Sequence, residues 1–464
     1  MNEKAALYYH LNEPYAAGLF EQPDKSAFAR YSRAARRYWE HCSPHGYDGG
    51  RLYPTGGKFN DPYAVLPDYS YTVSVKRELL AQKETQALAW ITEEIGRLPG
   101  IGSPHTVGGE GYTHSIPNYG RVAREGLDSY EKRTRALPPG DFRDGLLDVL
   151  AGIRDFHRRS LLFLKQRGAD KALVAALEKV PFQPARDLYE AVVCWNFIYY
   201  IDLCDNPGLL DADLMPFHSG EDITELLRAF FNNVDVNSGW SCALGPEYSP
   251  LTMQCLRAVK GLRRPSMELR VTGDMPGEVW SAAIDAIKTG GGQPALYNEA
   301  LYQQALGERF PHIPKEDLLR FNGGGCTETM LAGISNVGSL DAGINLALIF
   351  HQSLYDHLAR SKGFEAFYLA FLGDARRTIA DTLDQVNRNQ QARAEYRPQP
   401  MRSLLIDDCI DRGLDFNAGG ARYTWSVINV AGLINVIDSL LAVRELVYRN
   451  AEFTPEIFLG ECLQ

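Results

Sequence analysis

The chain has 464 residues, of which 45% are hydrophobic and 23% are charged, a composition typical of globular proteins that excludes a mostly disordered chain. Its 58 acidic residues exceed its 48 basic residues, which gives a formal net charge of −10. This acidity, without any dense run of Lys and Arg, argues against a nucleic-acid partner. No apolar run reaches the roughly 18–20 residues that span a bilayer, and the first residues lack a signal-peptide pattern. We therefore expect a cytoplasmic protein with no membrane contact.

The first part of the chain is predicted to be irregular at its start and helical after that. About the first 75 residues are rich in Tyr, Pro and Gly, as in Gly49–Gly57, and we expect them to form an irregular wrapping segment. Apolar residues then recur with the period of a helix over Val75–Arg97, Phe142–Arg167 and Ala185–Leu203.

After residue 235 the pattern changes to short β-prone runs that alternate with helical segments. We expect strands at residues 240–244, 267–271, 295–297, 319–323, 403–406 and 422–427. We expect helices at residues 251–259, 276–289, 299–306, 340–360, 364–391 and 432–449, and a last helix after Phe453-Thr454-Pro455. This alternation predicts an α/β protein whose catalytic residues lie at strand ends and in the following loops. The pattern alone does not separate a barrel from an open sheet.

Eight cysteines lie far apart along the chain, at positions 42, 194, 204, 242, 255, 326, 409 and 462. No two form a C-x-x-C pair, so the sequence predicts no metal site and no disulfide scaffold, and we expect reduced, mostly buried thiols. The P-loop, H-E-x-x-H and G-x-S-x-G motifs are also absent from the sequence. The glycines of Gly100–Gly111 and Gly290–Gly292 lack the spacing of a phosphate-binding fingerprint and are expected to form turns.

The most informative segment is Phe321-Asn322-Gly323-Gly324-Gly325-Cys326-Thr327-Glu328. Three glycines after a β-like run cost backbone entropy, so this segment requires unusual dihedral angles or a close approach. A carboxylate two residues from a thiol raises the pKa of that thiol, which argues against an ordinary thiolate nucleophile. A protonated thiol suits hydrogen-atom chemistry. A buried cysteine on a tight turn is the alternative explanation of this spacing.

Gly325-Cys326-Thr327-Glu328 resembles the Gly-Cys-Val-Glu loop of the glycyl radical enzymes, the relatives of pyruvate formate-lyase, glycerol dehydratase and choline trimethylamine-lyase. Segments similar to other family motifs occur at His114–Tyr119, Pro265–Arg270, Gly292–Asn298, Asp341–Asn345, Asp408–Ile410, Gly419–Tyr423 and Asp438–Leu440. The resemblance implies a glycyl-radical-enzyme-type α/β barrel surrounded by helices. It implies one pyruvate formate-lyase-like domain over 1–464, with a wrapping and helical part over about 1–235 and a barrel part with the Cys loop over about 236–464.

The family stores its radical on a glycine in a C-terminal Arg-Val-x-Gly-[Tyr/Phe] loop, and this sequence ends at Gln464 before such a loop. Arg270-Val271-Thr272-Gly273 is similar but lies upstream of Cys326, in a segment already matched to a strand. We therefore expect an incomplete barrel, with no glycyl radical domain and no bound cofactor. The radical is expected on a missing segment or on a separate glycyl radical subunit, installed by a radical-SAM activating enzyme.

The resemblance implies that Cys326 becomes a thiyl radical that takes hydrogen from the substrate. Glu328 would then act as general base on a neighbouring hydroxyl or ammonium group. The Cys-x-Glu pattern is that of the eliminase branch, the dehydratases and C–N or C–S lyases. Pyruvate formate-lyase has two adjacent cysteines, whereas Thr327 follows Cys326 here. We expect a small polar organic substrate and a homodimer. The alternative is a catalytically inactive, truncated homologue that binds a small molecule or a partner.

Two further residues have catalytic roles implied by the resemblance. Asp341 is expected to orient the substrate or relay a proton, although an Asp that opens a helix also serves as an N-terminal cap. His114 is similar to the family histidine that protonates or holds the leaving group. A structural histidine bonded to the backbone is the alternative for this position.

Four residues are candidates for substrate binding. Trp240 is expected to line the pocket, with core packing as the alternative for an aromatic residue on such a strand. Asp205 also fits an Asx turn. Arg270 also fits an ion pair in the barrel interior, and Asn298 ends the Pro-Ala-Leu-Tyr-Asn match.

Overall fold

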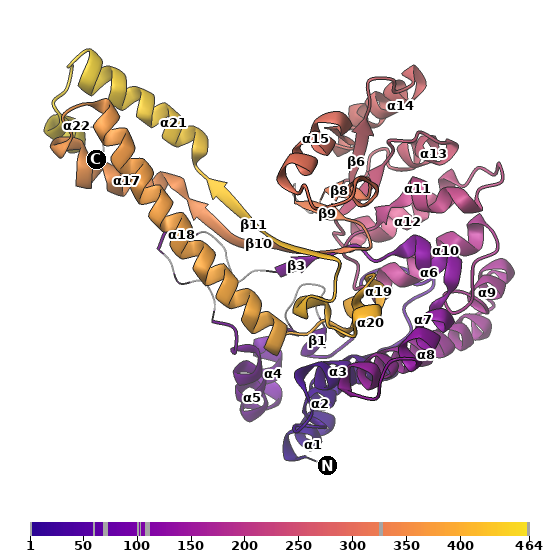
Figure 1. The fold of residues 1–464 in the computed structure, drawn as a ribbon. Helices are drawn as coiled ribbons and strands as arrows, with labels where there is room; N and C mark the ends of the chain where they lie inside the picture. Colours follow the sequence, from indigo (N-terminus) through magenta and orange to yellow (C-terminus); the bar gives the residue numbers. More distant parts are fainter. Residues whose placement is uncertain are drawn as a thin grey trace. The chain divides into compact units, whose positions relative to one another are not determined.

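The computed structural model describes residues 2–58, 61–67, 73–99, 102, 104–106, 112–323 and 328–461. It is a mixed α/β structure in which helices predominate (Figure 1). The chain divides into two compact units: residues 1–97, 113–337 and 393–425 form the first, and residues 98–112, 338–392 and 426–464 form the second. Among the predicted site residues that the structure describes, Asp341 belongs to the second unit and the others belong to the first.

The N-terminal segment begins with helices, so the prediction of an irregular wrapping segment is wrong for its first half. Helices α1 (Glu3–His10), α2 (Pro14–Phe20) and α3 (Ala27–His41) form there. The Ser26 hydroxyl caps α3 by accepting from the Ala29 N–H at 3.3 Å. The buried face of α3 then packs along a long helix from residues 141–166. The prediction is based on glycines such as those of Gly49–Gly57, which follow α3 in the sequence. The described residues of that stretch are irregular.

The three helical segments predicted from apolar periodicity are confirmed. They form α4 (Arg77–Lys83) with α5 (Thr85–Ile95), α8 (Asp141–Gln166) and α10 (Leu188–Ile201). Nearly every residue of α10 is buried, because other elements surround this helix. The remaining helices of this part are α6 (Tyr119–Glu125), α7 (Leu127–Arg135) and α9 (Lys171–Leu177).

Four parallel strands form the central sheet of the first unit, in the order β4-β5-β6-β7. Their bounds are Gly208–Leu209, Ser241–Leu244, Ser266–Val271 and Ala295–Asn298. The strands predicted at 240–244, 267–271 and 295–297 are thereby confirmed. Helices α11 (Leu210–Leu214), α12 (Thr224–Val236), α13 (Pro250–Ala258) and α14 (Gly277–Ala286) lie between the strands in the sequence.

A short antiparallel hairpin follows this sheet in the sequence. Helices α15 (Glu299–Arg309) and α16 (Lys315–Leu318) lead into strand β8 (Phe321–Gly323), which pairs with β9 (Thr329–Leu331). Strand β8 lies against β5 of the parallel sheet. The first strand of the hairpin thus lies beside the buried sheet.

Two predicted elements have the wrong type. Residues 340–345, predicted to begin a helix, instead complete strand β10 (Ser335–Asn345), and helix α17 (Leu346–His357) begins only after it. The Asn345 side chain caps α17 by accepting from the Leu348 N–H at 3.1 Å. β10 is the middle strand of a sheet in the order β11-β10-β3, so inter-strand pairing overrides the helical pattern of its residues.

The apolar run at 403–406, predicted as a strand, ends helix α19 (Pro400–Leu405). Pro400 occupies the first turn of this helix, where its fixed φ angle favours the helical conformation. All six residues of α19 are buried. A short run that is buried on every side carries no periodicity, so its pattern cannot distinguish a strand from a helix.

The second unit has its own apolar core between helices α17, α18 (Phe364–Tyr396) and α21 (Leu433–Ala442). Strand β11 (Tyr423–Ala431), which precedes α21, confirms the strand predicted at 422–427. The last described helix is α22 (Pro455–Glu461), in the predicted place. Strand β3 (Tyr112–His114) and the short helix α20 (Cys409–Arg412) complete the elements of interest. None of the described helices has the length and apolarity needed to cross a bilayer.

Candidate active site

The glycine loop leaves strand β8 at Gly323, and Glu328 is the first described residue after it. Cys326 lies outside the described residues, so its predicted place near the barrel centre stays a prediction. The Gly323 N–H donates to the Glu268 carboxyl group at 2.6 Å. A Cβ at Gly323 would lie 2.3 Å from Oε1 of Glu268, so only glycine fits at this contact. The first glycine of the loop is therefore explained by a buried acid on strand β6.

Glu268 is an acidic residue that the sequence analysis did not single out. It is 2% exposed and lies opposite Ala243 and Ala295 in the parallel sheet. The pKa of Glu268 is raised to about 8. Burial is the main cause and the negative charge of Glu328 adds to it, while hydrogen bonds with Gly323 and the Ser241 hydroxyl and the charge of Arg270 oppose the shift. Its signal in the sequence is an acidic residue between Met267 and Leu269 in a predicted strand, two residues before Arg270.

Glu328 is also buried, with 6% of its surface exposed. Its charge lies near enough to Glu268 to act on the pKa of that group. The predicted general base, Glu328, thus lies near the carboxyl group of Glu268. Glu268 contacts Gly323, before the segment that contains Cys326, and Glu328 follows that segment.

A second acidic cluster contains two of the predicted residues, His114 and Asp205. Nδ1 of His114 lies 2.8 Å from Oδ1 of Asp205, and both side chains are completely buried. The Arg402 guanidinium donates to the other Asp205 oxygen at 2.7 Å. A carboxylate at Nδ1 requires the proton on that nitrogen, so Nε2 is the basic nitrogen of the neutral ring. Arg402 was missed by the sequence analysis.

The Asx-turn alternative for Asp205 does not describe its contacts. Both carboxylate oxygens bond the side chains of His114 and Arg402. The preceding Leu203 and Cys204 have φ angles of 60° and 62°, a left-handed conformation that costs about 1–2 kcal/mol per non-glycine residue. Backbone strain is thus concentrated directly before the carboxylate.

Trp240 lies beside this cluster, at the start of strand β5. Its ring meets the His114 imidazole edge to face, with 5.9 Å between the ring centroids. The Arg264 guanidinium carbon lies 4.4 Å from the centroid of the Trp240 ring. The backbone N–H of Trp240 donates to the backbone carbonyl of Asp205 at 2.9 Å. Three predicted residues, one catalytic and two substrate-binding, therefore meet here.

Asp202 belongs to the same cluster and was not predicted. Oδ1 of Asp202 lies 3.9 Å from Nε of Arg402. Its Oδ2 is buried and has no hydrogen-bond partner in the part of the chain that the structure describes. Burial raises the pKa of Asp202 to about 8 despite the opposing charge of Arg402. The cluster thus contains one acid bonded by two cationic side chains and one acid that favours its proton.

The two remaining substrate-binding candidates of the first unit have structural partners. Arg270 forms a bidentate ion pair with Glu299, at 2.7 and 2.6 Å, and donates to the Leu319 carbonyl at 2.8 Å. The Asn298 side chain caps α15 by accepting from the Leu301 N–H at 3.0 Å. Arg270 thus has the contacts of the ion-pair alternative.

Asp341 lies in the second unit, in the middle of β10. Its carboxylate accepts from the Ser426 hydroxyl and from the Gln390 amide, the latter at 3.3 Å. The helix-cap alternative is wrong for Asp341, because Asn345 is the residue that caps α17. A Cβ at Gly338 would lie 1.9 Å from Oδ2 of Asp341, which explains the glycine there.

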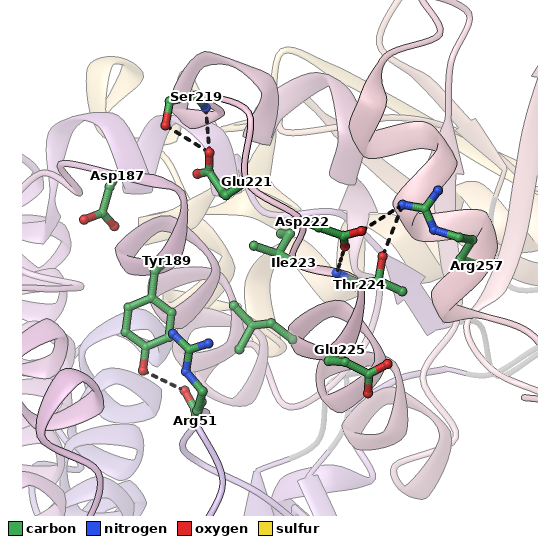
Figure 2. A pocket seen from close by; sticks show the side chains of 11 residues that line it. Arg51, Asp187, Tyr189, Ser219, Glu221, Asp222, Ile223, Thr224, Glu225 and Arg257 are labelled. Atoms are coloured by element: carbon green, nitrogen blue, oxygen red, sulfur yellow. Dashed lines mark hydrogen bonds and ion pairs between the residues drawn. The ribbon is translucent and has the colours of Figure 1, made fainter.

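A separate open cavity of about 760 Å³ lies in the first unit (Figure 2). It contains none of the predicted site residues. Figure 2 shows Arg257 bonded to Asp222 and Thr224, and Glu221 accepting from Ser219. We therefore place the candidate active site at the two buried acidic clusters.

Comparison with known proteins relates the chain to one family of enzymes. Residues 244–459 match the family model described as "Pyruvate formate lyase-like". The chain is 24% identical to trans-4-hydroxy-L-proline dehydratase of Clostridioides difficile, over 62% of this chain and 44% of that protein. It is 26% identical to (2S)-3-sulfopropanediol dehydratase of Klebsiella oxytoca, over 44% of this chain and 26% of that protein. The chain thus matches less than half the length of these curated relatives.

Solved structures show the same fold over nearly the whole chain. B12-independent glycerol dehydratase from Clostridium butyricum superimposes with a TM-score of 0.82 at 18% identity, over 99% of this chain and 73% of that one. A glycyl radical enzyme from Archaeoglobus fulgidus gives 0.81 at 17% identity, over 99% and 74%. The predicted α/β fold of this family is confirmed. Together with the family model over residues 244–459, these matches support the resemblance of the chain to the glycyl radical enzymes.

Proposed function

We propose that the chain is the Cys-loop part of a glycyl radical eliminase, a dehydratase or a C–N or C–S lyase, that acts on a small polar substrate. Its curated relatives include dehydratases of a hydroxyproline and of a sulfopropanediol. The observation that carries the proposal is the buried Glu328, two residues after Cys326 and beside a second buried carboxyl group. A base in that place can take a proton from a group next to the radical carbon.

In the proposed reaction, the Cys326 sulfur takes one hydrogen atom from a substrate C–H bond, which leaves a carbon radical. Glu328 takes the proton from the neighbouring hydroxyl or ammonium group, and the leaving group departs with the electron pair of its bond. The product radical regains one hydrogen atom from Cys326, so the thiyl radical is restored. A glycyl radical, held by another segment or subunit and installed by a radical-SAM activating enzyme, would supply the initial radical.

The second cluster fits the departure of the leaving group. Nε2 of the neutral His114 ring would hold that group as an acceptor, and a ring that carries a second proton on Nε2 would protonate it. Asp205 fixes the other proton on Nδ1, and Arg402 holds Asp205 in place. Trp240 would form a wall of the pocket beside His114. Asp341 remains a proposed orienting residue. We also propose a cytoplasmic homodimer, in keeping with the sequence analysis.

The test is product identity after co-expression with a radical-bearing partner and an activating enzyme, using diols, amino alcohols and hydroxylated amino acids. Cys326→Ser should abolish turnover, because an O–H bond is too strong to relay hydrogen. Glu328→Gln should lower elimination by about 10²–10⁴-fold while hydrogen exchange at the substrate carbon persists. Glu221→Gln, at an exposed acid outside the two clusters, is the matched control and should keep full activity.

Full elimination activity in Glu328→Gln would contradict the base assignment, and activity in Cys326→Ser would contradict the radical mechanism. A coenzyme A thioester as product would indicate acyl transfer instead. Substrate binding by the wild-type complex without any turnover would favour the alternative of a non-catalytic binding protein.

A further inference from the structure

We propose that Glu268 is a positioning residue of this site: as an uncharged carboxylic acid, it anchors the first glycine of the Cys326 loop and leaves the negative charge of the acid pair on Glu328. The inference rests on the proposed function, which it deepens. It concerns a residue of strand β6 that acts through the loop rather than on the substrate.

The anchor is a direct contact between the strand and the loop. Oε2 of Glu268 accepts from the Gly323 N–H at 2.6 Å, and Oε1 would lie 2.3 Å from a Cβ on the same glycine. Both carboxyl oxygens thus face one backbone position, where a side chain is excluded. The loop can leave β8 in this way only because an acid and a glycine meet there.

The surroundings of Glu268 favour its neutral form. The ionisable groups near it are Cys242 on β5, Arg270 on the same strand, Tyr297 on β7, Tyr302 on α15 and Glu328 after the loop. Four of these five are acids, neutral with their proton and negative without it, and Arg270 is the one cation near Glu268 among the residues that the structure describes. A buried carboxylate without a dedicated cation is costly, so such a group retains its proton.

The single cation is committed to another acid. Arg270 makes its two shortest contacts with the Glu299 carboxylate, at 2.7 and 2.6 Å, rather than with Glu268. The pKa of Glu268, raised to about 8 mainly by burial, agrees with this arrangement. At neutral pH the site therefore holds one buried acid with its proton beside a second acid that is required as a base.

The first test is the pH dependence of stability, measured on this chain by chemical denaturation. The pKa of Glu268 is higher in the folded than in the unfolded state, so its contribution is fully present at low pH and is lost as pH rises toward about 8. Glu268→Gln keeps the shape but does not titrate. Its stability relative to wild type should rise between pH 5 and pH 8, whereas a constant difference would overturn the retained proton.

The second test is a double-mutant cycle for the anchor. Gly323→Ala alone should destabilise the chain, because its Cβ would meet the Glu268 carboxyl group. In a Glu268→Ala background the obstructing group is gone, and most of that loss should disappear. Gly273→Ala, where a Cβ meets nothing within 4 Å, is the control. Additive effects of the two substitutions would overturn the anchor.

The third test uses the complete, activated complex. Wild-type elimination should fall as pH rises past about 8, when Glu268 ionises beside Glu328. In Glu268→Gln that decline should move upward by at least about one pH unit. An unchanged pH profile, or a loss as large as that of Glu328→Gln, would overturn the positioning role. If wild type shows no elimination at all, the proposed function fails, while the two stability tests still decide the role of Glu268.

Discussion

The first unit neutralises its two buried acidic clusters in different ways. Asp205 is bonded by the His114 ring and the Arg402 guanidinium, so its charge is met by cationic or polar side chains from distant parts of the chain. Glu268 is bonded by the Gly323 N–H and the Ser241 hydroxyl, which are neutral donors. Burying a carboxylate is costly at both positions. The charge of Arg402 offsets this cost at Asp205, whereas Glu268 avoids it by retaining its proton.

The difference separates two tasks that elimination requires. A carboxylate held by an arginine is fixed, so it can orient a histidine. A carboxylic acid that holds its own proton can lose it as the pH rises, and it responds to the charge of a neighbour such as Glu328. We expect the group of Arg402, Asp205 and His114 to be a rigid support, and the two acids with a raised pKa, Glu268 and Asp202, to respond to pH.

The largest effect is expected when the cluster around Asp205 loses Arg402, its cation. Arg402→Ala leaves the buried Asp205 with His114 alone and should cost about 3–5 kcal/mol of unfolding free energy, measured by chemical denaturation. Arg133→Ala, which breaks an exposed pair with Asp411, is the control and should cost about 0–1 kcal/mol. Equal losses in both variants would show that the buried pair is not the support that we describe.

A smaller effect is expected at Asp202, which lies in the same cluster as Asp205 and favours its protonated form. Its pKa is raised to about 8, so its stabilising contribution is lost as pH rises from about 4 toward 8. Asp202→Asn should gain on the order of 1–3 kcal/mol relative to wild type across that range. The measurement is a series of denaturation curves at different pH values. A pH-independent difference would show that folding does not raise the pKa of Asp202.

The smallest effect is expected in the second unit, where Asp341 is bonded by neutral donors. Ser426→Ala removes one hydroxyl donor from this carboxylate and should cost about 1 kcal/mol of unfolding free energy. Ser281→Ala, whose hydroxyl bonds a backbone carbonyl at an exposed helix position, should cost less. A loss as large as that of Arg402→Ala would mean that a neutral donor stabilises a buried carboxylate as strongly as a cation does. The contrast between Asp205 and Glu268 would then no longer hold.

The sequence predicts most of the fold because its strands are short apolar runs bounded by turn residues. Strands β5, β6 and β7 are of this kind, and so are the helices that alternate with them. Strand β10 was mistaken for the start of a helix, because its residues gain their structure from pairing with β11 and β3. Local pattern does not contain that information.

The site was predictable only where a motif carries it. Cys326, Glu328 and His114 came from the resemblance to a family, whereas Glu268 and Arg402 were missed. The Glu268–Gly323 contact joins residues 55 positions apart, and the Arg402–Asp205 contact joins residues 197 positions apart. A single sequence does not reveal such contacts. A charged residue inside an otherwise buried strand is the one local sign that could have drawn attention to Glu268.

The cysteines have a practical consequence for chemical labelling. The six described thiols are all buried, and burial raises the pKa of each of them: Cys42, Cys194, Cys204, Cys242, Cys255 and Cys409. A thiol that is buried and protonated reacts slowly with alkylating reagents. These six should therefore add only a slow background in the folded chain. Any fast alkylation of the folded chain would therefore not come from these six thiols, and mass spectrometry of the labelled peptides would identify its source.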